Sequence, residues 1–170
     1  MRSRRLAHLK KFSFVDQERV GLIGFSWGAI IGLLASSKAY AEVFSPAQRF
    51  AAVASFYPAC YRPATGNLPE LELLRPDTDK SLLVLMGERD TETPPAECLP
   101  RLQTLKERGA PVEWHLYPET THCWDCSSLN NFSKVDYLGN QIVYHYDKAV
   151  TSDSSQRAFA FLARHLKAKE

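Results

Sequence analysis

RVGLIGFSWGAIIGLLAS, residues 19–36, is an apolar segment interrupted at Ser26, which lies two positions from a glycine on either side. We predict a buried strand over Arg19–Phe25 and a helix over Trp27–Lys38. Where a strand turns sharply into a helix, the turning residue is strained, and nearby glycines let the two elements approach closely. The hydroxyl of Ser26 is therefore expected at the carboxyl edge of a sheet.

Short apolar runs and helix-like segments alternate along the chain, which is typical of a mostly parallel sheet with flanking helices. The other predicted parallel strands cover residues 50–57, 81–86 and 112–117, and a helix is predicted over 95–108. We expect the Pro-rich segment 58–76 to be irregular. These elements place the protein in the α/β class.

The last third of the chain carries two further signals. The Gly139-Asn140 dipeptide predicts a β-hairpin with a two-residue turn between strands at 134–138 and 141–146. The final helix is expected to begin near residues 151–153. Its apolar spacing places three residues on one face: Phe159, Leu162 and Leu166.

The bulk composition excludes several classes of protein. With 170 residues, 45% hydrophobic and 24% charged, we expect one globular domain over residues 1–170 and not a disordered chain. The net charge of +2 is too small to indicate a nucleic-acid partner, and no run approaches the roughly 18 apolar residues of a membrane helix. No signal-peptide pattern assigns a compartment. The one basic cluster is interpreted as a solvated helix face: Arg2, Arg4, Arg5, Lys10 and Lys11.

The segment Gly24–Gly28 fits the pattern G-x-S-x-G, which has mechanistic meaning when it joins a strand to a helix. In that context the serine is a nucleophile. The backbone N–H of Trp27, at the positive end of the helix, then stabilises an oxyanion beside it. The structural alternative is that Ser26 caps the helix and that the glycines serve tight packing. The motif alone leaves both interpretations open.

A nucleophilic serine needs a base, and the base needs an orienting acid, each on a loop that follows a strand. His122 follows the strand at 112–117 and is the candidate base. Asp90 follows the strand at 81–86 and is the candidate acid, with Glu88 and Glu92 as alternatives on the same loop. Three such residues occur in the order serine, acid, histidine at three strand ends. We therefore favour a catalytic triad over three separate structural roles.

With these residues placed, the sequence resembles the dienelactone hydrolase family, a branch of the α/β-hydrolases. The resemblance rests on RVGLIGFSWG (19–28), LLVLMGERDTETPP (82–95) and VEWHLYPETTHCWD (112–125), and it extends from about Val15 to the final helix. It implies hydrolysis of ester or lactone bonds of small molecules, with the catalytic roles on Ser26, Asp90 and His122. The family's best-known members carry a cysteine at the elbow, so an ordinary serine esterase fits this chain equally well.

The implied reaction needs no cofactor and no metal. His122 removes the hydroxyl proton as Ser26 attacks an ester carbonyl, and Asp90 holds the histidine in the required tautomer. Aromatic residues near the predicted strand ends are candidates for the wall of a substrate pocket, although such residues are more often core. They are Trp27, Phe56, Tyr57 and Trp124.

Four cysteines raise a rival interpretation. Cys123 and Cys126 have the C-x-x-C spacing of a redox or zinc motif, so a metal-binding or thiol-redox protein is one alternative. Cys60 and Cys98 each follow one of two adjacent predicted strands. A disulfide between them and a pair of buried free thiols are equally compatible with the sequence. A disulfide would indicate an oxidising compartment such as the periplasm or the cell exterior.

The elbow arrives by residue 26, whereas α/β-hydrolases have several strands before it. We therefore expect a partial α/β-hydrolase fold without the usual first strands and without the loop that supplies a second oxyanion donor. Weak catalysis and homo-oligomers formed through an open sheet edge are the expected consequences. A binding or assembly module without catalysis is the alternative function.

Overall fold

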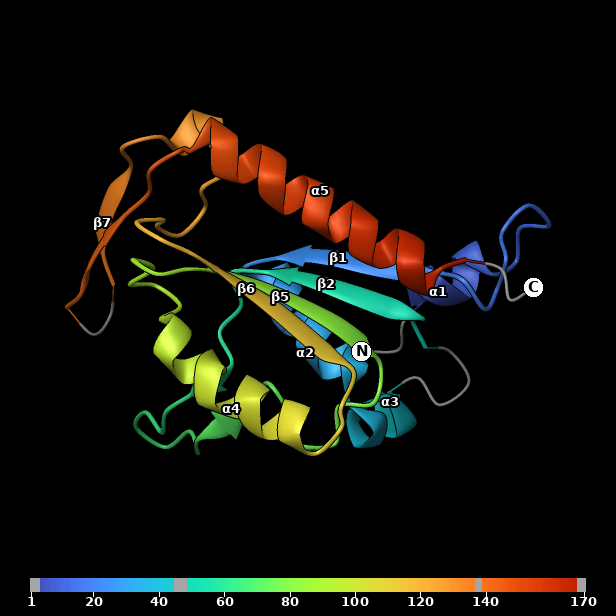
Figure 1. The fold of residues 1–170 in the computed structure, drawn as a ribbon. Coiled ribbons are helices and arrows are strands. Elements are labelled where there is room, and N and C mark those ends of the chain that lie inside the picture. The colour runs from blue at the N-terminus through green and yellow to red at the C-terminus, as the bar shows by residue number, and fades with distance from the viewer. Residues whose placement is uncertain (1–3, 45–48, 137–138, 168–170) are drawn as a thin grey trace.

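A four-stranded parallel sheet forms the centre of the protein in the computed structural model, which describes residues 4–44, 49–136 and 139–167 (Figure 1). The strands lie side by side in their order along the chain: β1 (Gly21–Phe25), β2 (Ala52–Phe56), β5 (Ser81–Gly87) and β6 (Val112–Tyr117). Every neighbouring pair is parallel. The predicted α/β class and the four predicted parallel strands are confirmed.

Helices cover both faces of this sheet (Figure 1). α2 (Trp27–Ser36) follows β1 and α4 (Pro95–Glu107) follows β5, and both pack on the same face. Right-handed crossovers between parallel strands that advance in one direction place their helices on one side. α5 (Lys148–His165) covers the opposite face. The short helices α1 (Arg4–Leu9) and α3 (Lys38–Phe44) lie near the amino ends of the strands (Figure 1).

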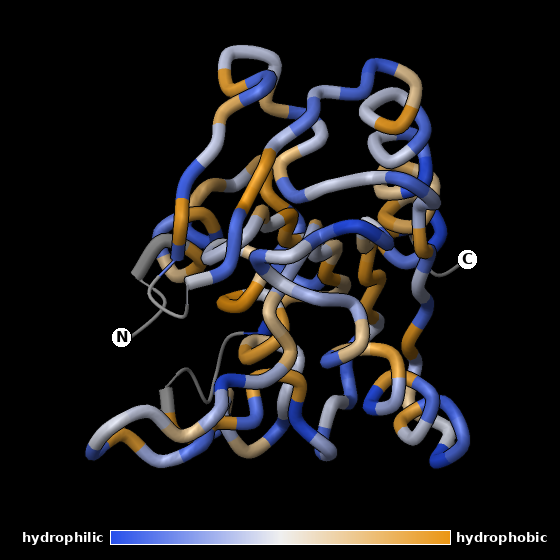
Figure 2. Tube along the Cα trace, turned by 90° about the vertical axis from the view of Figure 1, so that its left-hand side faces the viewer, coloured by the Kyte–Doolittle hydropathy of each residue, from blue (hydrophilic) through white to orange (hydrophobic). Residues whose placement is uncertain are grey.

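Side chains that alternate between the two faces of the sheet divide the core into two clusters. On β5, Leu82, Val84 and Met86 pack with α2 and α4, while Leu83 and Leu85 pack with α5. All five side chains are buried. Because successive residues of a strand face opposite sides, a continuous apolar run is needed where helices cover both faces. Figure 2 shows the hydrophobic segments gathered in the interior and the hydrophilic ones in the outer loops.

Gly24, near the end of β1, lies against the first turn of α2. A Cβ atom at this position would come within 2.3 Å of the Gly28 carbonyl oxygen and 2.8 Å of the Ala29 nitrogen. Both distances are well below van der Waals contact, so only glycine lets the strand and the helix approach this closely. At Gly28 an added Cβ would have no neighbour within 4 Å. The first glycine of the motif is therefore a packing requirement, and the second is not.

The predicted hairpin is present, but its turn is longer than expected. β7 (Ser133–Val135) and β8 (Gln141–Val143) pair in antiparallel fashion. The innermost described pair is Val135 with Gln141, so Gly139 and Asn140 do not form the predicted two-residue turn between paired strands. Residues 137–138 of the predicted first strand lie outside the described part of the chain.

The final helix begins before its predicted start. Asp147 caps α5, because its side chain accepts hydrogen bonds from the backbone N–H groups of Ala149 and Val150 at 2.8 and 2.9 Å. Phe159, predicted on the same face as Leu162 and Leu166, is 66% exposed, so that prediction is wrong for Phe159. The residues that pack on the sheet include Leu162 and Leu166 but not Phe159. Those fully buried are Ser154, Ala158 and Phe161.

β1 is one edge of the sheet, and the apolar side chains around it are exposed. Phe25 at its end, and Trp27 and Ile31 of α2, all lie on the surface. An edge strand with apolar neighbours is a surface suited to pairing with another strand. Self-association through this edge stays a prediction.

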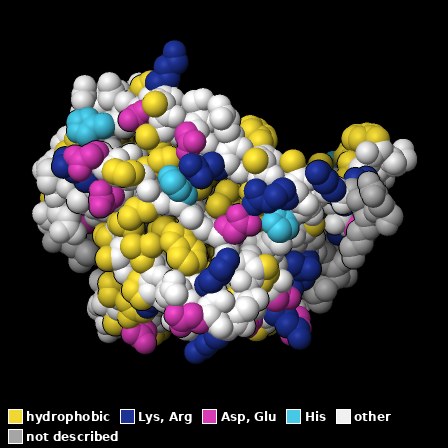
Figure 3. Space-filling view, viewed as in Figure 1, with side chains coloured by type: hydrophobic (Ala, Val, Ile, Leu, Met, Phe, Trp, Pro, Cys, Tyr) yellow, Lys and Arg dark blue, Asp and Glu magenta, His cyan; other side chains and the backbone are white. Residues whose placement is uncertain are grey.

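Charged side chains of both signs are interspersed on the face shown in Figure 3. One pair joins α5 to the other edge strand, since Arg164 lies 2.7 Å from Glu113 of β6. Within the described ranges, no helix is both long enough and apolar enough to cross a membrane.

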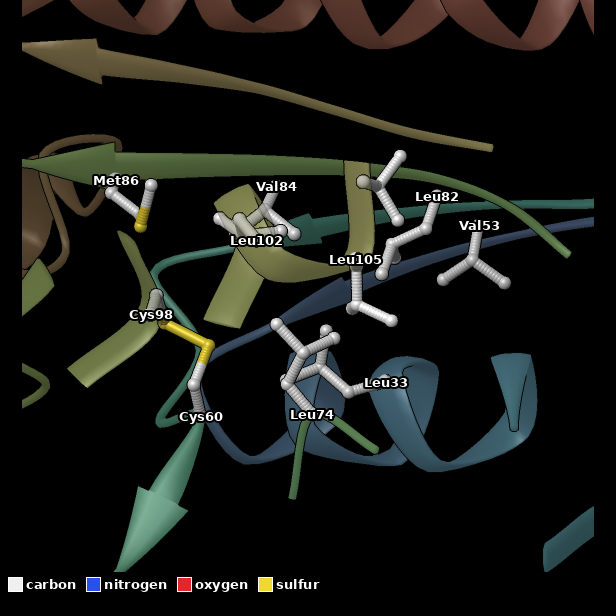
Figure 4. Packing of buried hydrophobic residues seen from close by; sticks show 11 residues of the cluster. Leu33, Val53, Cys60, Leu74, Leu82, Val84, Met86, Cys98, Leu102 and Leu105 are labelled. Carbon is white, nitrogen blue, oxygen red and sulfur yellow. A yellow bond between two sulfur atoms is a disulfide. The ribbon is translucent and has the colours of Figure 1, made fainter. Parts of the chain in front are cut away.

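Cys60 and Cys98 form a disulfide inside the cluster between the sheet and α4 (Figure 4). Both residues are fully buried, and the bond ties the segment after β2 to α4. The Cys60 carbonyl oxygen also accepts hydrogen bonds from the backbone N–H groups of Leu73 and Leu74. A short antiparallel pair in this region, β3 (Tyr61–Arg62) and β4 (Leu71–Glu72), corrects the expectation that it is irregular. Of the two states that the sequence left open for this cysteine pair, the structure has the disulfide.

Gly24→Ala is expected to lower the free energy of unfolding by about 2 kcal/mol, because the added methyl group must displace the backbone of α2. Gly28→Ala is the matched control, since its methyl group enters open space and alanine favours a helix. Urea denaturation followed by circular dichroism measures both variants. Equal stability of the two would contradict the packing role of Gly24.

Replacing Cys60 and Cys98 together with alanine is expected to lower the free energy of unfolding by about 4 kcal/mol, because their bond closes a loop with a sequence separation of 38. The control replaces Cys123 and Cys126, whose bond spans a separation of 3 and is expected to contribute about half as much. Denaturant titration compares the two double variants. A smaller loss for the first pair than for the control would contradict this account.

Candidate active site

Ser26 forms the turn between β1 and α2 in a backbone conformation that residues other than glycine rarely adopt, with φ 48° and ψ −115°. Its backbone N–H donates to the Phe56 carbonyl oxygen of β2 at 3.0 Å, which ties the turn to the sheet. The side chain makes no capping hydrogen bond to α2. The geometry therefore gives no support to the interpretation of Ser26 as a helix cap.

His122, on the loop after β6, links the Ser26 hydroxyl to a buried carboxylate. Its Nε2 lies 3.0 Å from Ser26 Oγ, and its Nδ1 lies 2.7 Å from Asp90 Oδ2. The residue is only 2% exposed. With the proton on the nitrogen that faces the carboxylate, Nε2 is left to accept from the serine hydroxyl. The structure thus brings together the three residues predicted from the sequence.

Asp90 is 3% exposed, and hydrogen bonds surround its carboxylate. Oδ1 accepts from the backbone N–H groups of Glu92 and Thr93 at 2.9 and 2.8 Å. Oδ2 accepts from the Thr93 hydroxyl at 2.8 Å. These donors compensate the burial of the carboxylate and fix its orientation. Of the three candidate carboxylates, Asp90 is the one hydrogen-bonded to Nδ1 of the imidazole. Glu88 is exposed.

The loops that carry Asp90 and His122 are joined by backbone contacts. The N–H of Arg89 donates to the Thr120 carbonyl oxygen at 2.9 Å. This approach requires a glycine at the end of β5, because a Cβ atom on Gly87 would lie 2.4 Å from the same carbonyl oxygen. The missing side chain of Gly87 therefore helps to set the distance between carboxylate and imidazole.

Backbone strain gathers at the carboxyl edge of the sheet. Five non-glycine residues within the described ranges have positive φ, and four of them lie at this edge. They are Ser26, Tyr57, Glu119 and Cys123, with φ of 48°, 41°, 54° and 58°. Such conformations cost about 1–3 kcal/mol each and persist where the surrounding structure imposes them. Their concentration marks this edge as a candidate site independently of its side chains.

The aromatic residues predicted to line a pocket take different positions. Phe56 and Trp124 are buried in the core cluster beneath α5, which favours the core role that the sequence left as the alternative to a pocket wall. They face inward because α5 covers that side of the sheet. Tyr57 is also buried, with its ring centroid 4.5 Å from that of His122. Trp27 is 80% exposed beside Ser26 and stays a candidate for substrate contact.

Tyr57 also holds the loop that follows His122. Its hydroxyl donates to Asp125 Oδ1 at 2.7 Å. Burial, together with this hydrogen bond, raises the pKa of the Tyr57 phenol well above its ordinary value, so the hydroxyl remains a donor at neutral pH. Trp124 donates its indole N–H to Ser154 Oγ of α5 at 3.2 Å. The loop is thereby tied to both β2 and α5.

The C-x-x-C pair after His122 is a disulfide. Cys123 is bonded to Cys126 and Cys60 to Cys98, so the two bonds use all four cysteines of the chain. A carboxylate oxygen of Asp125 and the sulfurs of Cys123 and Cys126 lie close enough together to ligate one metal ion. Cysteine ligates a metal as a thiolate, however, and these two sulfurs are oxidised to a disulfide. A zinc site of four converging thiolates is therefore contradicted.

The β7–β8 hairpin adds a cluster that we did not predict. Glu92, considered from the sequence only as an alternative acid, accepts hydrogen bonds from Lys134 Nζ at 2.7 Å and from the Tyr144 hydroxyl. Its Oε2 lies 3.9 Å from His122 Nε2. Thr93, also missed, places its hydroxyl 3.2 Å from His122 Nδ1. Lys134 and Tyr144 lie 42 and 52 positions from Glu92 in the sequence, and no local pattern predicts contacts over such separations.

Solved structures of hydrolases share this fold. A candidate dienelactone hydrolase from Klebsiella pneumoniae is 20% identical with a TM-score of 0.69, and the match covers 94% of this chain and 57% of that chain. A carboxylesterase from Lactobacillus plantarum is 16% identical with a TM-score of 0.65, covering 98% of this chain and 66% of that chain. An esterase from Pyrococcus furiosus is 18% identical with a TM-score of 0.65, covering 96% and 60%. At such identities the likeness establishes the fold alone, and the chain spans 57–66% of the length of these structures.

The family assignment comes from the sequence as a whole. No curated protein matches the chain. The model of the dienelactone hydrolase family, however, matches residues 2–166, which include the elbow and the loops of Asp90 and His122. This confirms the resemblance seen in the three sequence motifs. The chain belongs to the dienelactone hydrolase family.

Proposed function

We propose that the chain hydrolyses carboxylic ester or lactone bonds of small molecules through an acyl-enzyme on Ser26. The hydrogen-bonded series from Ser26 Oγ through His122 to Asp90 carries this proposal. Its members follow β1, β6 and β5, at the edge where parallel α/β sheets hold their sites. The family assignment and the fold shared with esterases support the same reaction class.

The first half of the reaction moves the acyl group onto the protein. His122 Nε2 takes the hydroxyl proton as Ser26 Oγ bonds to the carbonyl carbon, which gives a tetrahedral oxyanion. Asp90 stabilises the imidazolium without taking its proton. When the oxyanion collapses, the bond to the leaving oxygen breaks, and the imidazolium delivers its proton to that oxygen. An alcohol departs, and the acyl group stays on Ser26.

The second half returns the enzyme to its starting state. His122 Nε2 takes a proton from water as the water oxygen bonds to the acyl carbon. The new tetrahedral intermediate expels Ser26 Oγ, which recovers a proton from the imidazolium. One water is consumed and a carboxylic acid is released. A lactone yields the acid and the alcohol in one molecule.

Trp27 is the proposed donor to the oxyanion. It is the first residue of α2, so its backbone N–H is one of those that have no acceptor within the helix. It directly follows the nucleophile at the positive end of the helix dipole. A donor aimed at a developing oxyanion typically contributes about 10²- to 10³-fold in turnover.

The two disulfides support a second, coarser proposal about where the protein works. They use all four cysteines, and such bonds persist where thiols are not kept reduced. We therefore propose an oxidising compartment, periplasmic or extracellular.

Ser26→Ala and His122→Ala are each expected to lower kcat for a short-chain aryl ester by about 10⁴-fold or more, because either change removes the nucleophile or its base. A fluorophosphonate probe should label Ser26 in the wild-type protein and leave the His122→Ala variant unlabelled. His8→Ala, which removes an exposed histidine of α1, is the control and should behave as wild type.

Two outcomes would contradict the proposed function. One is probe attached to a residue other than Ser26. The other is a labelling rate that His122→Ala leaves unchanged. Folded wild-type protein that neither hydrolyses esters nor reacts with the probe would favour a binding or assembly module.

A further inference from the structure

Glu92 places a second carboxylate beside the imidazole, on the opposite side from Asp90. Its Oε2 lies 3.9 Å from His122 Nε2, the nitrogen that faces Ser26 Oγ at 3.0 Å. Asp90 Oδ2 lies 2.7 Å from the other nitrogen, Nδ1. The imidazole therefore lies between two carboxylates, and the acyl-transfer steps described above use only one of them.

Hydrogen bonds from the β7–β8 hairpin hold the Glu92 carboxylate in place. Lys134 Nζ donates to Oε1 at 2.7 Å, and the Tyr144 hydroxyl donates to Oε2. Tyr144 is buried, and its ring centroid lies 5.5 Å from that of His122. Because both oxygens are engaged, the carboxylate is held at a distance from Nε2. It does not displace Ser26 as the hydrogen-bonding partner of that nitrogen.

The same contacts keep Glu92 charged. Burial by itself raises the pKa of the Glu92 carboxyl, but the hydrogen bonds from Lys134 and Tyr144 outweigh it and hold the pKa below its ordinary value. Glu92 therefore carries its negative charge throughout the neutral range. Lys134 offsets part of that charge at Oε1, whereas Oε2 is the oxygen within 3.9 Å of the imidazole.

We propose that Glu92 is a positioning residue that acts through His122, by stabilising the protonated imidazole formed while Ser26 is acylated. This inference rests on the proposed acyl transfer. Glu92 takes no proton itself: the proton moves from Ser26 Oγ to Nε2 and from there to the leaving oxygen. An opposite charge close to a largely buried imidazole favours its charged form, and the partial offset by Lys134 leaves about a tenfold effect on rate.

Several titratable groups face the imidazole from the elements packed around it. They come from the loop after β5, the end of β2 and the hairpin: Asp90, Glu92, Tyr57 and Tyr144, with Lys134 behind Glu92. Glu92→Gln changes only one of these charges. Glutamine has nearly the same shape, and its amide oxygen still accepts one of the two hydrogen bonds, whereas its amide nitrogen can only donate.

The test is the rate at which a fluorophosphonate labels Ser26, measured from about pH 5 to pH 9. Glu92→Gln is expected to lower the maximal labelling rate about tenfold. It should also lower the pH below which the labelling rate falls, called the acid side of the profile, because an imidazole without this neighbouring charge loses its proton more readily. Lys134→Met removes the offsetting charge and should move the acid side to higher pH. Glu88→Gln is the control, since it neutralises an exposed carboxylate on the same loop.

The outcomes separate the two proposals. A Glu92→Gln variant with the maximal rate and acid side of wild type would overturn the role of Glu92 and leave the proposed function intact. A lower rate without any shift of the acid side would also overturn it, because a merely structural defect has that result. Wild-type protein that does not react at Ser26 would overturn the proposed function and this inference with it.

Discussion

The contact between Gly24 and the backbone of α2 fixes the direction in which the chain leaves β1. A Cβ atom at this position would lie 2.3 Å from a carbonyl oxygen of the helix, so the two elements meet only because it is missing. The chain then turns through Ser26 at a positive φ of 48°. A second glycine repeats this principle, since the missing side chain of Gly87 lets the Thr120 carbonyl approach and brings the loops of Asp90 and His122 together. Two missing side chains thus position the groups of the candidate site.

His122 is held by contacts from several loops at the carboxyl edge of the sheet. The imidazole is oriented by Asp90 on one nitrogen and packed by the Tyr57 ring, while Glu92 lies beside its other nitrogen. The loop after it is tied to β2 through Asp125 and closed by a disulfide. An imidazole held this firmly needs little rearrangement during the proposed proton transfer, which is what electrostatic preorganisation requires. The strained backbone around it is the cost of this arrangement.

The sequence predicted what depends on neighbouring residues and missed what depends on distant ones. The four strands were found because each is an apolar run bounded by turn residues. Ser26, Asp90 and His122, which the structure brings within hydrogen-bonding distance, were proposed because each lies on a loop that follows such a run. Position near a strand end does not say which side a residue faces. For that reason the sequence left Phe56 and Trp124 open between a pocket wall and the core, and the structure buries both in the core. The partners of Glu92 lie 42 and 52 positions further along the chain, and no local pattern predicts which residues such distant segments bring together.

Covalent catalysis at Ser26 is the central claim, and trapping the acyl group tests it most directly. Wild-type protein reacting with an aryl acetate is quenched with acid during turnover, at a mildly acidic pH that slows release of the acyl group, and its peptides are analysed by mass spectrometry. We predict one acetyl group, on Ser26, and none in the His122→Ala variant. Ester hydrolysis by wild-type protein that leaves Ser26 unmodified and acetylates another residue would contradict the account.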